Sequence, residues 1–216
     1  MSGARYQPRL VLATRNPGKV REIAAVYAHL PILLRSLADY PQVGELPEEG
    51  GSYAENAGAK ARTVAAVTGE IALADDSGVE IEALQGAPGI PSARFLGEHA
   101  TDADRNARVL ALLRETPDAR RTAWYRAAVA VALPDGTVRI FEGACEGRIA
   151  RIPRGTGGFG YDPIFVPAGD SRTMAEVPPD VKNRLSHRGR ALRSAEPYLV
   201  EMLGLGGKDR PARGAK

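Results

Sequence analysis

Cysteine is almost absent from this 216-residue chain, which contains only Cys145. A single cysteine cannot form an intramolecular disulfide, and it has no CxxC partner with which to build a thiolate zinc site. We therefore expect a protein of the reducing cytoplasm, with Cys145 as a small core residue.

Long hydrophobic runs are missing as well. No apolar stretch approaches the roughly 20 residues of a membrane span, and Met1 to Pro8 contain neither an apolar segment nor a small-residue cleavage pattern for export. Apolar residues make up 44% of the chain and charged residues 25%, as in soluble globular proteins. The sequence predicts a soluble protein that does not associate with a membrane.

The body of the chain also lacks an excess of basic charge. The net charge is +3, but residues 206–216 (GGKDRPARGAK) hold four basic side chains and one acidic one, so residues 1–205 are balanced. A nucleic-acid binder is expected to carry a basic stripe on its folded body. We expect no nucleic-acid partner, one folded domain of two lobes over residues 1–205, and a disordered basic tail over residues 206–216.

The hydrophobic pattern predicts an α/β protein with a mixed sheet. A strand over 9–14 leads into a helix with Asn16 as N-cap and Pro17 at its first position, and Ser52 to Glu55 is typical of a capping box. Further strands are expected over 32–36, 71–75, 122–133 and 137–146, the last two as a hairpin, and further helices over 52–67, 101–114 and 190–203. Strands alternate with helices early and pair with each other late, which favours a mixed sheet.

The segment Thr14 to Lys19 stands where the first strand leads into the first helix. Unpaired amides at a helix N-terminus and the charge of Lys19 suit a polyphosphate, and Gly18 permits close approach of the backbone. The segment is not a GxxxxGK[ST] loop, so an ordinary strand-to-helix turn is the alternative. On the next helix, Asn56 and Lys60 lie one turn apart and either face one ligand together or belong to a solvated face.

Asp75 and Asp76 follow an apolar segment and precede Ser77-Gly78. Neighbouring strand residues point to opposite faces, but we expect the strand to end here, so that both carboxylates reach one site. Oxygen ligands of this kind suit Mg²⁺, and Glu48 or Glu49 can supply another. A surface turn is the alternative, because Asp, Ser and Gly all favour turns.

Two further segments have the residue types of a base-binding site. In GGFGYDPIF (157–165), glycines let the backbone approach a flat ligand, and Phe159 or Tyr161 offers a ring for stacking; packing of this loop on the core is the alternative. Lys182 and the segment Ser186 to Gly189 can donate hydrogen bonds to an oxygen on a base. They can equally be the basic start of a helix.

Taken in order, these segments resemble the inosine triphosphate pyrophosphatases, a family of non-canonical purine nucleotide pyrophosphatases. The resemblance spans about residues 9–203. Its matching segments are ATRNPGK (13–19), EEGGSYAENAGAKA (48–61), ADDSGVEIEALQGAPGIPSAR (74–94), GTGGFGYDPIF (155–165) and SHRGRAL (186–192). It implies an elongated mixed β-sheet with two α/β lobes flanking a substrate cleft, and a homodimer.

The resemblance implies Mg²⁺-dependent hydrolysis of ITP, dITP and XTP to the monophosphate and pyrophosphate, which removes these nucleotides from the pool. Lys19 and Lys60 are then the cations that neutralise phosphate oxygens, Asp76 the proton acceptor for the attacking water, and Glu48, Asp75 and Asp76 the magnesium ligands. With Asn56 added from the helix face, the implied substrate-binding residues are Thr14, Arg15, Asn16, Pro17, Gly18, Lys19, Asn56, Ser77, Phe159, Gly160, Tyr161, Asp162, Lys182, His187 and Arg188.

Two other functions compete with this one. A Maf-type pyrophosphatase acting on modified pyrimidine nucleotides is disfavoured by the GGFGYDPIF and SHRG segments. A non-catalytic nucleotide-binding protein is disfavoured by the retained lysines and carboxylates. A neutral body likewise weakens the case for a nucleic-acid binder.

Overall fold

The computed structural model describes residues 7–206, so apart from Gly206 the basic tail lies outside the described residues. One mixed sheet has the strand order β2-β1-β3-β4-β5-β6. Its strands are β1 (Arg9–Leu12), β2 (Leu33–Ser36), β3 (Ala72–Ile81), β4 (Thr122–Ala132), β5 (Val138–Ile149) and β6 (Phe165–Pro167). β1 pairs in parallel with β2 and β3, and the β3-β4-β5-β6 pairs are antiparallel, which confirms the predicted mixed sheet.

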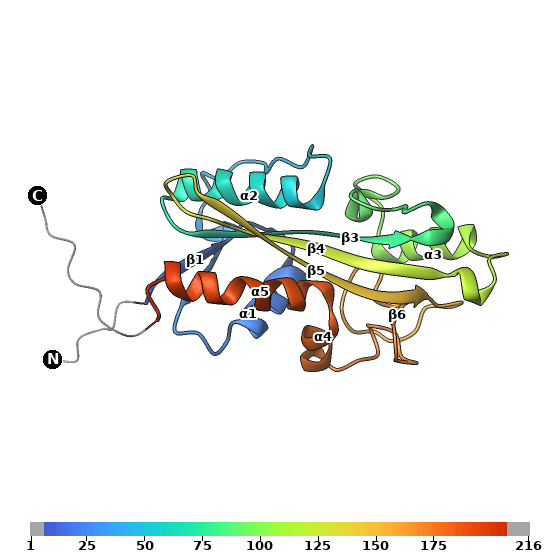
Figure 1. Cartoon of the computed structure of the whole chain (residues 1–216). Helices are drawn as coiled ribbons and strands as arrows, with labels where there is room; N and C mark the ends of the chain where they lie inside the picture. Colours follow the sequence, from blue (N-terminus) through green and yellow to red (C-terminus); the bar gives the residue numbers. More distant parts are fainter. Residues whose placement is uncertain (1–6, 207–216) are drawn as a thin grey trace, which may run out of the picture.

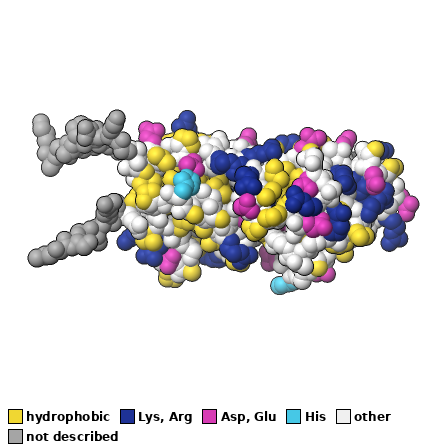
Figure 2. Space-filling model, turned by 90° about the horizontal axis from the view of Figure 1, so that it is seen from below, with side chains coloured by type: hydrophobic (Ala, Val, Ile, Leu, Met, Phe, Trp, Pro, Cys, Tyr) yellow, Lys and Arg dark blue, Asp and Glu magenta, His cyan; other side chains and the backbone are white. Residues whose placement is uncertain are grey.

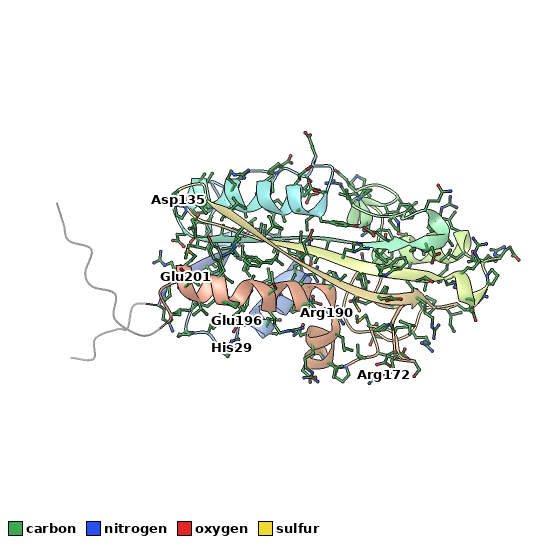
Figure 3. All side chains as sticks on the ribbon, in the orientation of Figure 1. His29, Asp135, Arg172, Arg190, Glu196 and Glu201 are labelled. Carbon is green, nitrogen blue, oxygen red and sulfur yellow. The ribbon has the colours of Figure 1, made fainter. Side chains whose placement is uncertain are left out.

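Helices cover both faces of this sheet and give the molecule an elongated, layered shape (Figure 1). The helices are α1 (Pro17–Val26), α2 (Tyr53–Thr68), α3 (Asp102–Leu112), α4 (Pro179–Leu185) and α5 (His187–Met202). α2 lies on one face, and α1 and α5 lie together on the other. Just after the end of α1, His29 pairs with Glu196 of α5 at 2.9 Å (Figure 3).

The alternation of side chains along β3 assigns residues to these two faces. Ala72 and Ala74 pack in the cluster under α2, whereas Leu73 packs in the cluster with α1 and α5. Further along the strand, Val79 and Ile81 belong to a third cluster that includes Cys145, which is a small core residue as expected. The long strands β3, β4 and β5 therefore run through both ends of the molecule.

Most predicted elements are confirmed, and their differences have local causes. Asn16 caps α1 with Pro17 as first helical residue, and Thr101 with Asp104 forms a complete capping box on α3. On α2, Ser52 accepts from Glu55 N–H as predicted, but the Glu55 carboxylate accepts from Gly51 rather than Ser52.

The elements after β5 differ from the sequence prediction more than the earlier ones do. α5 begins at His187, not Arg190, because Ser186 is its N-cap, and Pro197 lies within it without ending it. The short elements α4 and β6 were not predicted.

Basic and acidic side chains are interspersed on the face of the molecule seen in Figure 2. No helix among residues 7–206 is long and apolar enough to span a bilayer.

Candidate functional site

A pocket of about 510 Å³ opens beside β3, where the shorter β1 stops pairing with it. The last β1–β3 pair is Leu12 with Leu73. Beyond it, Lys19 donates to the carbonyl of Asp75 at 2.9 Å, and Val79 N–H donates to Ser92 Oγ at 2.9 Å. Side chains from both faces of the sheet therefore meet at this open stretch of strand edge.

Most of the predicted site residues line this pocket. They are Asn16, Pro17, Gly18, Lys19, Glu48, Asn56, Asp76, Ser77, Phe159, Gly160, Tyr161, Asp162, Lys182, His187 and Arg188. Lys60 and Asp75 lie behind this lining, in contact with Asp76 and Lys19 respectively. Thr14 accepts from the backbone of Asn16, and Arg15 points away to donate to the carbonyls of Val43 and Gly44.

The expected end of the strand at Asp75 and Asp76 is wrong: β3 continues through both acids to Ile81. Ser77 and Gly78 are strand residues paired with β4, not a turn. A Cβ on Gly78 would lie 2.5 Å from the carbonyl oxygen of Gly89, so a close backbone approach requires this glycine. Because the strand continues, the two carboxylates point to opposite faces and are not brought together.

Asp75 lies on the α5 side and is fully buried. Arg188 contacts both of its oxygens, at 2.9 and 3.1 Å, and Lys19 contacts Oδ1 at 2.7 Å. Burial alone raises the pKa of Asp75, but Arg188 and Lys19 outweigh burial and hold this pKa far below its usual range. The Asp75 carboxylate therefore stays ionised and holds two cations at the pocket wall.

Asp76 lies on the α2 side, in contact with Lys60 at 2.8 Å and Asn56 at 3.2 Å. Lys60 also contacts Glu48 at 2.6 Å, so one ammonium bridges two carboxylates from separate segments. Burial lowers the pKa of Lys60, but Asp76 and Glu48 outweigh burial and raise it. This confirms that Asn56 and Lys60 face one site from adjacent turns of α2.

The N-terminus of α1 differs from the expected row of free amides. The Asn16 side chain accepts from the amides of Gly18 and Lys19 at 2.8 and 3.3 Å, so its own cap already occupies both. A Cβ on Gly18 would lie 2.5 Å from the ring of Phe159. The glycine therefore admits this aromatic ring beside the helix start.

Phe159 lines the pocket beside the start of α1, between two cations. Lys182 Nζ is 4.9 Å and Arg188 Cζ 5.3 Å from its ring centroid, within cation–π range. Asp162 fixes this part of the pocket by accepting from the Phe159 amide at 2.8 Å, from Lys182 and from Tyr125. Burial raises the pKa of Asp162, although Lys182 opposes it.

Tyr161 does not offer a free ring, because it is buried and its hydroxyl donates to the carbonyl of Ser92 at 2.9 Å. Of the two candidate stacking residues, only Phe159 is partly exposed. The two alternatives for the loop are therefore both realised: Tyr161 packs on the core, and Phe159 lines the pocket.

His187 stacks on Tyr125 with ring centroids 4.5 Å apart, and its buried Nδ1 has no hydrogen-bond partner among residues 7–206. Burial and then Arg188 hold its pKa well below the usual range, against an opposing effect of Asp75. A neutral, unpartnered ring nitrogen at the pocket wall is available to a ligand.

This buried histidine predicts a pH dependence of stability. Since the pKa of His187 is lower in the folded than in the unfolded chain, the unfolded chain binds more protons below about pH 6.5, and stability falls there by up to about 1.4 kcal/mol per pH unit. Between pH 7.5 and 5.5 we expect the wild type to lose about 1 kcal/mol more than His187→Gln. Urea unfolding at both pH values measures this, and equal losses would contradict a neutral His187.

Several residues in or behind the pocket wall are not among the predicted site residues. Glu22 of α1 pairs with Lys182 at 2.6 Å and with Arg188 at 2.5 Å, and Arg94 pairs with Glu48. On α3, Asp102 accepts from the amide of Gly160 at 2.7 Å while Asn106 donates to its carbonyl at 3.1 Å. Contacts between distant segments create these roles, and of these residues only Arg94 lies in one of the matching segments, as the last residue of 74–94.

The contact of Asp102 with Gly160 predicts that removing the Asp102 side chain weakens substrate binding without destabilising the fold. Gly160 has a φ of +62°, and the loop before it bends at other glycines of positive φ, so we expect loss of this tether to loosen the position of Phe159. Asp102→Ala should raise KM at least several-fold at nearly unchanged melting temperature. Asp104→Ala is the control: it removes the α3 capping box and should lower the melting temperature without changing KM.

The sequence and the structure of this chain are similar to those of known proteins. The sequence model of the Ham1 family matches residues 10–198. A dITP/XTP pyrophosphatase of Geobacter sulfurreducens is 49% identical over 88% of this chain and 96% of that protein. The structure of a HAM1 protein from Coxiella burnetii matches with a TM-score of 0.81 at 41% identity, covering 90% of this chain and 100% of that one. The crystal structure of a nucleoside-triphosphatase / dITP/XTP pyrophosphatase from Mycobacterium abscessus matches with a TM-score of 0.70 at 46% identity. This match covers 88% of this chain and 99% of that one.

Proposed function

The chain belongs to the Ham1 family, and we propose that it hydrolyses non-canonical purine nucleoside triphosphates such as ITP, dITP and XTP to the monophosphate and pyrophosphate. One feature of the pocket carries this proposal. Lys60, Asp76 and Glu48 meet on its α2 side (the phosphate end), and Phe159 with Lys182 and Arg188 forms an aromatic and cationic wall on its α4–α5 side (the base end). The first end suits phosphates and the second suits a base, so one nucleotide can contact both.

The donors at the base end favour a 6-oxopurine. Lys182 and Arg188 carry only donors, and a purine with an oxygen at C6 offers them an acceptor. The amino group of adenine is itself a donor and finds no acceptor on these two side chains, so it stays unpaired when buried, at a cost of about 1 to 3 kcal/mol. Sites built around such hydrogen bonds discriminate strongly, so ATP is expected to be a poor substrate.

The carboxylates on the α2 side fit a magnesium ion. Asp76 and Glu48 each have an oxygen within 2.8 Å of the same ammonium, so both already converge on one cation. Magnesium in nucleotide sites is usually held by one or two carboxylates together with phosphates and waters. We assign Asp76 and Glu48 to this ion, which would supply charge neutralisation to the phosphates, and we assign Asp75 to holding Arg188 and Lys19.

The reaction needs positioning and charge more than covalent chemistry. Water attacks the α-phosphorus, the bond from this phosphorus to the bridging oxygen breaks, and pyrophosphate leaves with the bridging oxygen. Asp76 orients the water and accepts its proton, while Lys19 and Lys60 stabilise charge on the phosphate oxygens. Asn56 holds the second oxygen of Asp76 in place.

A substrate panel tests the proposal. ITP, dITP and XTP should be hydrolysed with kcat/KM at least about 10²-fold above ATP and GTP, with pyrophosphate as the product. GTP also carries an oxygen at C6, so its expected exclusion depends on its 2-amino group and not on these donors. Modified pyrimidine nucleotides and the ordinary CTP and UTP complete the panel, and chromatography resolves the products. Comparable rates on ATP, or orthophosphate and a nucleoside diphosphate as main products, would overturn the proposed function. A preference for pyrimidine nucleotides would favour the Maf-type alternative.

Three accompanying proposals need their own tests. Activity should vanish with EDTA and return with Mg²⁺. Sedimentation of the intact protein tests the homodimer, which rests on the family resemblance. Deleting residues 206–216 should leave turnover and melting temperature nearly unchanged if residues 1–205 form the folded unit. We also propose that the protein is a soluble enzyme of the cytoplasm.

A further inference from the structure

Arg94 lies at the phosphate end of the pocket. It belongs to a short 3₁₀ turn (Ser92–Arg94) that lies alongside the edge of β3. Its guanidinium pairs with the Glu48 carboxylate, and Nη2 lies 3.4 Å from the Glu48 carbonyl oxygen. Glu48 also holds Lys60, so this one carboxylate serves two cations at once. Arg94 is therefore a third cation beside Lys19 and Lys60, with no role so far in the reaction.

The backbone beneath Arg94 is held firmly. Ser92 is buried; its Oγ accepts from Val79 N–H of β3, and its carbonyl accepts from the Tyr161 hydroxyl, both at 2.9 Å. These bonds tie the turn to the sheet edge and to the glycine-rich loop. The side chain of Arg94, by contrast, is 43% exposed and has room to change partner.

Energetics favour such a change of partner. The Glu48 side chain is 41% exposed, and ion pairs at this exposure contribute about 0 to 1 kcal/mol, so little is lost when this one opens. A guanidinium binds phosphate oxygens in a bidentate way, with short charge-assisted hydrogen bonds. Terminal phosphates bring more negative charge than the single carboxylate of Glu48.

We propose that Arg94 leaves Glu48 when substrate binds and contacts the terminal phosphates, which depart as pyrophosphate. This rests on the proposed function, because it needs a triphosphate with its base at Phe159. Arg94 then binds the leaving group, Glu48 is freed on that side, and Lys60 remains with Asp76. The base end of the pocket takes no part in the exchange.

Pyrophosphate binding tests this directly. Calorimetry with the full-length chain in EDTA, and product inhibition during ITP hydrolysis in Mg²⁺, should both show Arg94→Gln binding pyrophosphate at least about 10-fold more weakly than wild type. KM for ITP should rise while the preference for ITP over ATP stays the same, and Arg94→Lys should recover part of the loss. Arg126→Gln is the matched control, since Arg126 forms a similarly exposed pair with Glu80 on β3 and does not line the pocket.

Three outcomes distinguish the possible failures. Unchanged pyrophosphate affinity in Arg94→Gln, with a higher Mg²⁺ requirement, would show that Arg94 only holds Glu48 and would overturn the inference. Failure of the wild type to hydrolyse ITP or to bind pyrophosphate would instead contradict the proposed function, and the inference with it. Equal affinities of the Gln, Lys and wild-type proteins would also overturn it.

Discussion

Replacing Asp76 by asparagine should lower turnover on ITP at least about 10²-fold and leave the fold intact. Asparagine keeps the shape of the side chain and an oxygen that can accept from Lys60, although its amide nitrogen cannot replace the oxygen that accepts from Asn56, so one hydrogen bond is lost. It cannot accept a proton from water, and it removes one of two negative charges around Lys60. Steady-state kinetics with a pyrophosphate readout measures the loss.

A matched control separates chemistry from folding in this experiment. Asp180→Asn changes the same functional group in an exposed ion pair with Arg184, outside the pocket lining, and should behave like the wild type. Circular dichroism and melting temperature should be similar for all three proteins. Near-normal turnover in a folded Asp76→Asn protein would refute the role of Asp76.

Local rules explain why so many elements are predictable from sequence. The caps at Asn16 and Thr101 and the hairpin between β4 and β5 depend on residues a few positions apart. The same holds for Asn56 and Lys60, whose relation follows from one helical turn. These features are visible before any tertiary contact is known.

The acid pair shows where local rules mislead. Asp, Ser and Gly in sequence predict a turn, but the ten residues of β3 continue through them because each pairs with β4 along its whole length. The acids are tolerated in a buried strand because each meets a cation from a different helix. Arg188 is 113 positions from Asp75 in sequence, a separation that no local pattern spans.

Contacts between residues far apart in sequence also explain why some residues of the site cannot be predicted. Glu22 lies on α1 among residues whose spacing indicates only a helix, and its role depends on Lys182 and Arg188 arriving from α4 and α5. Motifs identify the parts that touch a ligand. The counter-ions that hold those parts come from elsewhere in the chain and become visible only in the fold.

The counter-ions form a buried cluster whose charges balance: Lys19, Lys182 and Arg188 against Glu22, Asp75 and Asp162. Arg188→Met should destabilise the protein by about 3 to 5 kcal/mol, because it leaves Asp75 and Glu22 with one cation each in a buried site. Asp75→Asn should also destabilise it, by leaving the opposite charge in excess. The double variant restores the balance, so its loss should fall at least about 1 kcal/mol short of the sum of the two single losses.

The pH dependence of these losses identifies their cause. In the unfolded chain the pKa of Asp75 is near 4, and in the folded wild type it is much lower. This difference contributes stability that is present at pH values above about 4 and is lost as the pH falls toward the folded pKa. Without Arg188, burial is opposed only by Lys19 and the hydrogen bond from Ser77, so the pKa of Asp75 rises and the carboxyl protonates earlier during acidification. A protonated Asp75 needs no counter-ion, and the stability gap between wild type and Arg188→Met should therefore narrow as pH falls from 7 toward 4.5. Urea unfolding across this range measures the gap; a gap independent of pH would assign the loss to packing of the arginine side chain instead of to its charge.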